Sequence, residues 1–310
     1  TIENTGSSAA ANVSVLLELD TTNFDYSQVR SDGADIRFGT TICSETFNIP
    51  YFVETWNPSG RSKIWLRLRS VPANGEAFIV MYYGNSAITT NAGSFATVFP
   101  SARISGGSDL SLSGSQTFDW FELESGDTLN VVARSSTTIN AQRIIIEGNI
   151  DGRFDGEAAG GGTPGNGSGS GGGTGSSNAG GGGGSYGGAG GQGGFDSADT
   201  PGTGGSTYGD TTSVSVSLGS GGGAGAGRRG GAGGGAISLI GHDITLGSGT
   251  VINMDGEDGL GGNGIQNNGG GGGSGGGILV ASYNLEILGG NLAARRGDGG
   301  DGSNGFFGAR

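Results

Sequence analysis

Glycine is spread very unevenly along this chain, and its distribution limits the possible folds more than any other feature. The sequence has 310 residues and 74 glycines, and 61 of these glycines lie in residues 156–310. Since an average chain is about 7% glycine, the first half has ordinary globular composition and the second half does not. Each ordered glycine costs about 0.5–1 kcal/mol in chain entropy, so an ordered second half needs many compensating contacts.

Residues 1–98 show the alternation of apolar and polar side chains that is typical of half-buried strands. The clearest runs are Val13–Leu19, Ile64–Arg69 and Phe78–Tyr83. Gly, Pro, Asn and Ser interrupt the runs, and none of them has a helical period. Several short strands within about 95 residues predict an all-β module, a sandwich of two sheets.

A repeat of three similar units begins at residue 129. The units cover residues 129–152, 236–256 and 278–297, and each holds three short apolar segments. Three strands in about 22 residues form one coil of a parallel β-helix, and such coils must stack to bury their apolar faces. The sequence therefore predicts a three-coil β-solenoid over residues 129–310. Residues 99–128 are predicted to be a bridge whose aromatic side chains at 118–121 cap the solenoid.

Glycine-rich excursions at about 156–235, 259–276 and 297–305 interrupt the repeat. One interpretation is a set of flexible, disordered loops. The other is a bundle of extended threefold helices with polyproline II geometry, here polyglycine II, which have no internal hydrogen bonds. Only glycine lets such backbones approach closely enough to bond to one another. Because all excursions leave from the same corner of the coil, we favour the ordered bundle.

Several segments of the first half together resemble a known family. They are Thr1–Gly6, Val15–Asp20, Ser31–Phe38, Pro50–Glu54, Lys63–Trp65 and Met81–Asn85. Their order resembles domain of unknown function 2341, over about residues 1–98 and with a shortened first strand. That family occurs in secreted and surface proteins of bacteria, archaea and their viruses. The resemblance implies a sandwich and an extracellular setting, and it implies no activity and no catalytic residues.

The second half loosely resembles glycine-rich tail-fibre adhesins of phages and glycine-rich surface proteins of prokaryotes. This likeness rests on the glycine runs rather than on a motif. It implies a protein of a cell surface or a virion surface. The predicted architecture is thus all-β throughout: a β-sandwich, then a short parallel β-helix with glycine-rich excursions.

Charge and composition argue against several functional classes. The formal net charge is −13 and the pI is about 4.3, whereas binding to nucleic acid or to an anionic membrane needs clustered Lys and Arg. The sequence has one cysteine, Cys43, so no intramolecular disulfide forms. No run of residues reaches the roughly 18 apolar residues of a membrane-spanning helix, so no membrane insertion is expected.

The sequence also gives little indication of a catalytic site. With one histidine, His242, and one cysteine, a zinc site of the usual ligands is not available. We interpret His242 as a turn residue between two strands, and we expect the chain not to be an enzyme. A polysaccharide-degrading β-helix is the alternative, because Asp and Glu are plentiful, although no spacing selects a catalytic pair.

Acidic turns recur at equivalent places in the repeat. The residues are Asp151, Asp155, Asp255, Asp258, Asp298 and Asp301. Stacked in register, they would form a ladder of carboxylates that calcium would neutralise with oxygen ligands. Asp-Gly is also an ordinary turn sequence, which explains the same pattern without a metal. Calcium is therefore a weak candidate, and no other cofactor is expected.

These observations predict a non-enzymatic structural or adhesive subunit of an extracellular fibre, either a cell-surface filament or a phage tail fibre. Its expected partner is itself, through strand pairing by the N-terminal residues Thr1, Ile2, Glu3, Asn4 and Thr5 or by the edge they leave. The alternative is a glycan-binding module. In that case Trp56, beside a predicted exposed loop, is the best candidate for stacking on a sugar, although packing in the sandwich is the favoured explanation for these aromatic residues.

Overall fold

The computed structural model describes residues 1–40, 49–161, 164–194, 199–209, 215–262 and 268–300. The regular secondary structure of this part of the chain is nearly all strand, with one 3₁₀ turn, η1 (Tyr26–Gln28), and one short helix, α1 (Phe95–Val98). The all-β class is therefore confirmed. No helix among the described residues has the length and hydropathy of a membrane span. The chain divides into two compact units, Thr1–Ala102 and Arg103–Arg310.

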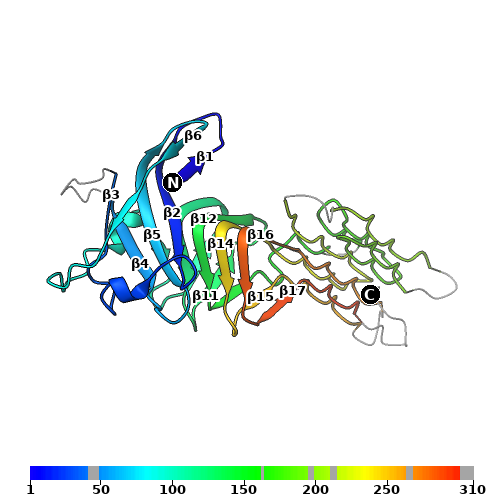
Figure 1. Cartoon of the computed structure of the whole chain (residues 1–310). Coiled ribbons are helices and arrows are strands. Elements are labelled where there is room, and N and C mark those ends of the chain that lie inside the picture. Colours follow the sequence, from blue (N-terminus) through cyan, green and yellow to red (C-terminus); the bar gives the residue numbers. More distant parts are fainter. Residues whose placement is uncertain (41–48, 162–163, 195–198, 210–214, 263–267, 301–310) are drawn as a thin grey trace. The chain divides into compact units, whose positions relative to one another are not determined.

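The first unit consists of small antiparallel sheets around one core (Figure 1). The strands are β1 (Ile2–Asn4), β2 (Ala10–Leu19), β3 (Arg37–Gly39), β4 (Tyr51–Thr55), β5 (Ser62–Val71), β6 (Gly75–Ala77) and β7 (Val80–Tyr82). The largest sheet has the order β2-β5-β4, and β1-β6 and β3-β7 are two-stranded. Alternation in β5 places Ile64, Leu66 and Leu68 in the core, while Trp65 on the other face packs against Phe99.

The second unit contains two five-stranded parallel sheets. One sheet, called the long-strand sheet after its four strands of 10 or 11 residues, consists of the two-residue strand β8 (Arg103–Ile104) and of β10 (Gly114–Leu123), β12 (Ser136–Ile146), β14 (Ala236–Leu246) and β16 (Gly277–Ile287). The short strands are β9 (Leu110–Leu112), β11 (Thr128–Val131), β13 (Asn149–Asp151), β15 (Val251–Asn253) and β17 (Asn291–Ala293). Long and short strands alternate along the chain, and each sheet follows sequence order, so each long–short pair forms one rung of a stack.

The rungs are held in register by columns of apolar side chains. Ile144 lies opposite Ile244, and Leu246 opposite Ile146, in adjacent long strands. In the short strands Ile150 lies opposite Ile252. All six side chains are at most 1% exposed and belong to one core cluster. Because a slip by one residue would turn every such side chain outward, this buried core fixes the register.

The rungs differ from the predicted coils in two respects. Each coil was predicted to hold three short strands, but segments 236–240 and 243–246 both belong to β14, so a rung has two strands. The parallel register skips His242 between Gly241 and Asp243, and this local irregularity explains the apparent break in the sequence pattern. The predicted bridge at 99–128 contains strands of the same sheets, because Phe121 and Leu123 of β10 extend the buried columns.

The glycine-rich segments are ordered by hydrogen bonds to one another rather than by strand ladders. Residues 180–185 illustrate the pattern, since successive N–H groups donate in turn to three neighbouring segments. Gly180 and Gly183 donate to the oxygens of Gly194 and Gly191, each at 2.8–2.9 Å. Gly181 and Gly184 donate to the oxygens of Gly269 and Gly272. Gly182 and Ser185 donate to those of Thr174 and Gly171. Donation to each neighbour thus repeats every third residue. Figure 1 shows these segments as extended traces that run beside one another.

The spacing between these segments leaves no room for side chains. A Cβ atom added to Gly173 would lie 2.0 Å from the carbonyl oxygen of Gly182, and one added to Gly193 would lie 2.0 Å from that of Gly180. Real Cβ contacts do not fall below 3.0 Å. The close approach of backbones, and not flexibility, therefore accounts for glycine at these positions.

Candidate functional site

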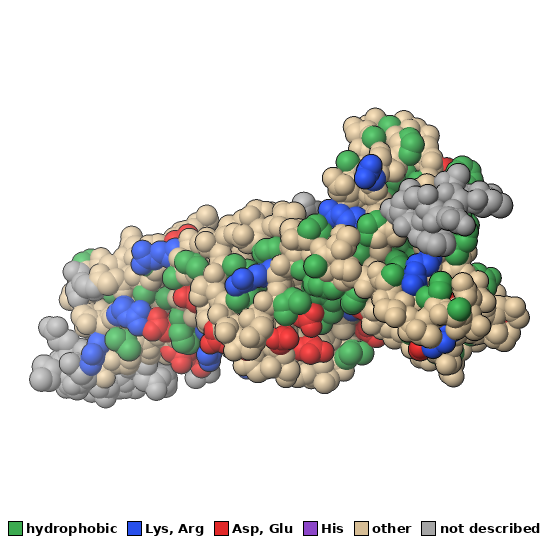
Figure 2. All heavy atoms as spheres, turned by 90° about the vertical axis from the view of Figure 1, so that its left-hand side faces the viewer, with side chains coloured by type: hydrophobic (Ala, Val, Ile, Leu, Met, Phe, Trp, Pro, Cys, Tyr) green, Lys and Arg blue, Asp and Glu red, His purple; other side chains and the backbone are tan. Residues whose placement is uncertain are grey.

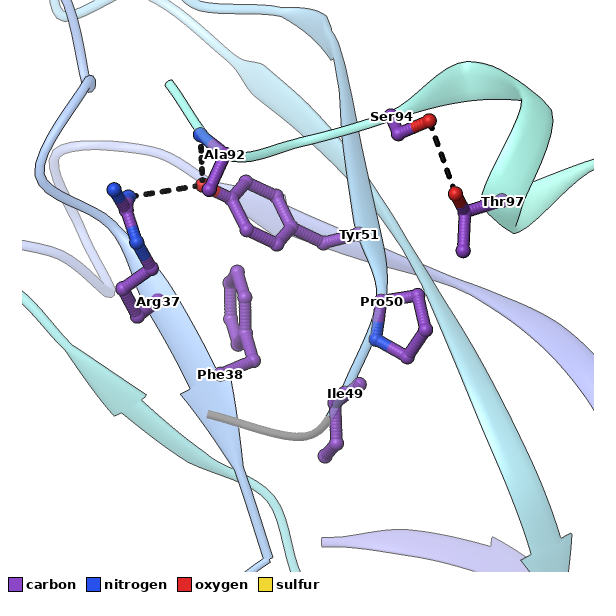
Figure 3. A pocket seen from close by; sticks show the side chains of 8 residues that line it. All are labelled: Arg37, Phe38, Ile49, Pro50, Tyr51, Ala92, Ser94 and Thr97. Carbon is purple, nitrogen blue, oxygen red and sulfur yellow. Dashed lines mark hydrogen bonds between the residues drawn. The ribbon is translucent and has the colours of Figure 1, made fainter. Parts of the chain in front are cut away.

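The first unit contains a pocket of about 360 Å³ between β3, β4 and residues 92–97 (Figure 3). Its polar centre is the hydroxyl of Tyr51, which contacts the Ile36 oxygen at 2.7 Å and accepts from Arg37 Nη1 and the Ala92 amide at 3.2 Å. Arg37 also donates to the oxygens of Ala34, Ile36 and Thr90. These polar groups are engaged in holding loops together, so the pocket offers a bound molecule few free partners.

Trp56, the candidate for sugar stacking, is packed within an aromatic cluster. Its ring lies on Gly33, where an added Cβ would approach the ring carbons to 2.8 Å. The ring centroid is 5.2 Å from that of Tyr26 and 6.4 Å from that of Phe24, both edge to face. The indole N–H donates to the oxygen of Ser31 at 3.0 Å. This environment supports the packing interpretation of Trp56 rather than the sugar-binding one.

The N-terminal residues predicted to pair with another subunit have a partner inside the chain. Ile2, Glu3 and Asn4 form β1, which pairs antiparallel with Ala77, Glu76 and Gly75 of β6. Ile2 also packs against the core of the first unit. Asn4 ties the segment further, because its side-chain amide donates to the oxygens of Val71 and Pro72. The prediction overlooked this internal pairing because a three-residue strand carries too little pattern to identify its neighbour.

The acidic turn that follows β13 contains an internal ion pair. Both carboxylate oxygens of Asp151 accept from Arg153, at 2.7 Å to Nη2 and 3.0 Å to Nε. The hydrogen bonds from Arg153 lower the pKa of Asp151. Burial, followed by the charge of Asp151, raises the pKa of Asp155. An arginine therefore supplies a positive charge next to Asp151, the role considered for calcium at these turns.

The next acidic turns bind backbone groups of the neighbouring segment. Asp255 Oδ1 accepts from the amide of Arg295, and Asp258 Oδ1 accepts from the amide of Asp298, both at 2.6 Å. The predicted carboxylate ladder is thus replaced by acid-to-backbone contacts that keep adjacent segments in register. Among the described residues, no three His, Cys, Asp or Glu side chains gather as a metal site would require. Asp301 lies outside the described residues.

His242 lies at the irregular position of β14 and not in a turn. Its Nδ1 shares a hydrogen bond of 2.5 Å with Asp243 Oδ2, and its ring stacks on Tyr283 with centroids 5.2 Å apart. The other oxygen of Asp243 accepts from the Asn284 side chain at 2.9 Å. These contacts join β14 to β16 and give His242 a structural role in the sheet.

A polar row on the outer face of the long-strand sheet was missed by the sequence analysis. Arg143, which is 6% exposed, lies over the ring of Trp120 at 5.8 Å and donates to Thr245 Oγ1 at 2.7 Å. The only sequence signal was that Trp120, Arg143 and Asp243 occupy the same position in successive strands. Figure 2 shows charged side chains of both signs scattered over a surface that is mostly backbone and small polar groups.

Comparison with known proteins identifies part of this chain. Residues 32–133, about a third of the sequence, match a family described as Domain of unknown function (DUF2341). The resemblance of the N-terminal module is thereby confirmed, although the match omits β1 and β2 and continues through β11 of the second unit. No match among the curated proteins or the solved structures was found, and the likeness of the second half to tail fibres is not confirmed.

Proposed function

We propose that this chain is a structural and adhesive subunit of an extracellular fibre and has no enzymatic activity. The observation that carries this proposal is the array of lateral backbone hydrogen bonds in the glycine-rich segments. Such an array uses the peptide groups for cohesion, and it exposes few side chains that could bind or transform a substrate. A rigid element with few reactive side chains is suited to a structural part that projects from a surface.

The two parallel sheets are, in this proposal, the faces of a short parallel β-helix. Support comes from the strict order of the rungs and from the single core that the long and short strands share. A rung cannot bury its apolar face alone, so stacking gives the second unit a base that resists bending.

The glycine segments are, in the same proposal, a polyglycine II bundle. A threefold extended helix turns successive N–H groups toward three directions, so each direction recurs every third residue. The amides of Gly180 and Gly183 donate to one neighbouring segment, and those of Gly181 and Gly184 donate to another, as this rule requires. A second example is the pair formed by Gly219 with Gly234 and Gly222 with Gly231. Glycine is required because the neighbouring backbones would collide with Cβ atoms.

The engagement of polar groups in both units supports a non-catalytic role. Tyr51 and Arg37, which line the pocket, bond to backbone carbonyls and to each other. His242 is bonded to Asp243 and stacked on Tyr283. An extracellular or virion-surface location, and assembly with further copies, belong to the same proposal. Their support is the family resemblance and the acidic composition, with a net charge of −13.

Hydrogen exchange of the full chain tests the observation on which this function depends. The amides of Gly182 and Gly222, which donate to Thr174 and Gly231 at 2.9 Å, are expected to exchange far more slowly than unstructured glycines. Fast exchange throughout residues 164–194 and 219–235 would refute the proposal that the glycine-rich segments form a rigid element. Immunogold electron microscopy of the native source tests location, and label confined to the cell interior would refute the extracellular fibre.

A further inference from the structure

The stack ends at a rung that the described residues cover only at its start, where a Cβ added to Gly277 would meet Val216 and Tyr186. Strands β16 and β17 are the last members of their sheets, and each pairs on one side only among the described residues. We call Gly277–Ala293 the terminal rung. The outer edge of its 11-residue strand β16 presents backbone N–H and C=O groups, which favour the addition of another strand.

The apolar columns of the core continue into this rung and are open there. Leu285 extends the column of Ile244, and Ile287 extends that of Leu246. The buried members are 1% and 0% exposed, whereas Leu285 and Ile287 are 47% and 57% exposed. In the short-strand sheet, Leu292 is 43% exposed next to the fully buried Ile252. A patch with this composition at the end of a ladder is characteristic of an interaction surface.

We propose that the terminal rung binds the terminal rung of a second copy of this chain, with β16 antiparallel to its counterpart across a twofold axis. The lengths of the strands select this partner. The opposite end of the stack offers β8, which has two residues, and β9, which has three, so it cannot pair along an 11-residue edge. Contact between identical ends gives each edge a partner of equal length, and the two open cores merge.

The charge of the surface fits a contact between identical copies. The whole chain carries a net charge of −13, yet Glu286 is the only charged residue between Gly277 and Ala293. Two acidic molecules therefore meet through a nearly neutral face. At about 3.3 Å per residue, β16 spans roughly 36 Å, so the end face buries on the order of several hundred Å² per copy. That area approaches the roughly 800 Å² per partner of a standard interface.

This inference deepens the proposed function, because it names the contact between subunits, and it rests on that function for the choice of partner. A twofold contact closes on itself and stops at two copies. Longer assembly would therefore use a different surface. Hydrogen exchange of the glycine segments reports on the proposed function independently of this contact, so the two proposals fail separately.

Light scattering of the full chain after gel filtration tests the contact. The wild-type chain is expected to be a dimer, and Leu285→Arg with Ile287→Arg is expected to weaken dimerisation at least ~100-fold, because it buries charge without a partner. The control is Phe78→Arg, which changes a side chain of the first unit that is 69% exposed and should leave the dimer intact. Far-ultraviolet circular dichroism verifies that each variant is folded.

Three results would overturn the contact. The first is a wild-type chain that stays monomeric at about 100 µM, even if it binds some other protein. The second is a wild-type assembly of more than two copies. The third is a folded double variant that remains a dimer. If the double variant does not fold, Leu292→Lys alone, at a side chain that is 43% exposed, replaces it with the same expected loss of the dimer.

Discussion

Replacing one glycine of the bundle by alanine tests whether backbone contact holds the second unit together. Gly222 is buried, donates to the Gly231 oxygen at 2.9 Å and accepts from the Gly160 amide at 2.8 Å. An added Cβ would lie 2.1 Å from the Gly271 oxygen and 2.5 Å from the Gly271 carbonyl carbon. Because such contacts need at least 3.0 Å, the segment that contains Gly271 must move by about 1 Å.

The cost of that movement can be estimated from the bonds that Gly271 makes. Its amide donates to Gly223 and its oxygen accepts from Gly231, both at 2.9 Å, and a shift of about 1 Å breaks them. Two lost hydrogen bonds cost about 2 kcal/mol, and the strain that remains after the segment has moved adds about 1 kcal/mol, at the low end of overpacking costs. Alanine offsets about 0.4–1 kcal/mol by restricting the unfolded chain. We expect Gly222→Ala to destabilise the second unit by about 2–3 kcal/mol.

Calorimetry and hydrogen exchange of the full chain measure this loss. For a unit of this size, the expected free-energy change corresponds to a fall in Tm of roughly 5–10 °C. Exchange should accelerate at Gly223 and Gly231 but not in the core of the first unit. The matched control is Gly161→Ala, because Gly161 is exposed and has no atom within 4 Å of an added Cβ. The control should leave Tm unchanged or slightly raised.

The reasoning would be refuted if the two variants had the same Tm and the same exchange rates. Equal behaviour would mean that the segments have room for a methyl group at Gly222. The glycines would then reflect flexibility, and the function proposed for the second unit would lose its main support.

Other perturbations probe the remaining contacts. Glu257→Gln should destabilise the chain by about 1 kcal/mol at pH 7, because the bidentate pair with Arg229 is weakened at a half-exposed site. Burial raises the pKa of Glu257, but hydrogen bonds from Arg229 and the Ala232 amide outweigh it, and the net pKa is lowered. The wild-type advantage is therefore present above the ordinary glutamate pKa and is lost as the pH falls through the lowered one, so urea midpoints of the two chains should converge in acid. Asp155→Asn should stabilise at pH 7, by less than about 1 kcal/mol, because burial and the Asp151 charge raise the pKa of Asp155. That gain should disappear below the ordinary aspartate pKa, and a thermal melt that shows destabilisation at pH 7 would contradict it. EDTA should leave Tm unchanged, whereas a fall that calcium reverses would support a calcium site at the acidic turns. Trp56→Ala should cost about 3 kcal/mol in urea unfolding and leave any retention on a glycan array unaltered.

Much of the strand content was predictable from local pattern. The alternation in residues 13–19 and 64–69 identified β2 and β5, and the apolar segments at 144–146, 236–240 and 243–246 lie in β12 and β14. Period-two alternation reports which side chains face a core, and this information is carried by a few consecutive residues. The sequence also indicated that Cβ atoms would clash with neighbouring backbones in the glycine-rich segments, because only glycine permits backbones to approach so closely.

The candidate site was less predictable, because its contacts join residues that are far apart in sequence. Asp151 pairs with Arg153 two positions away, yet Asp255 and Asp258 bind the backbone 40 residues later. Stacking in register was expected to bring carboxylates together, and instead it brought the carboxylates of Asp255 and Asp258 to backbone amides. Trp56 was ambiguous for a similar reason, since its ring lies on Gly33 in a different loop.

The sequence by itself determined the all-β class, the inward side chains of the repeat and the places where only glycine fits. The tertiary structure decided that two predicted strands join through His242, that the supposed bridge belongs to the same sheets, and which segment each glycine amide binds. The physical reason is the range of the interactions: alternation and turns are local, whereas register and lateral hydrogen bonds depend on backbones that meet only after the chain has folded.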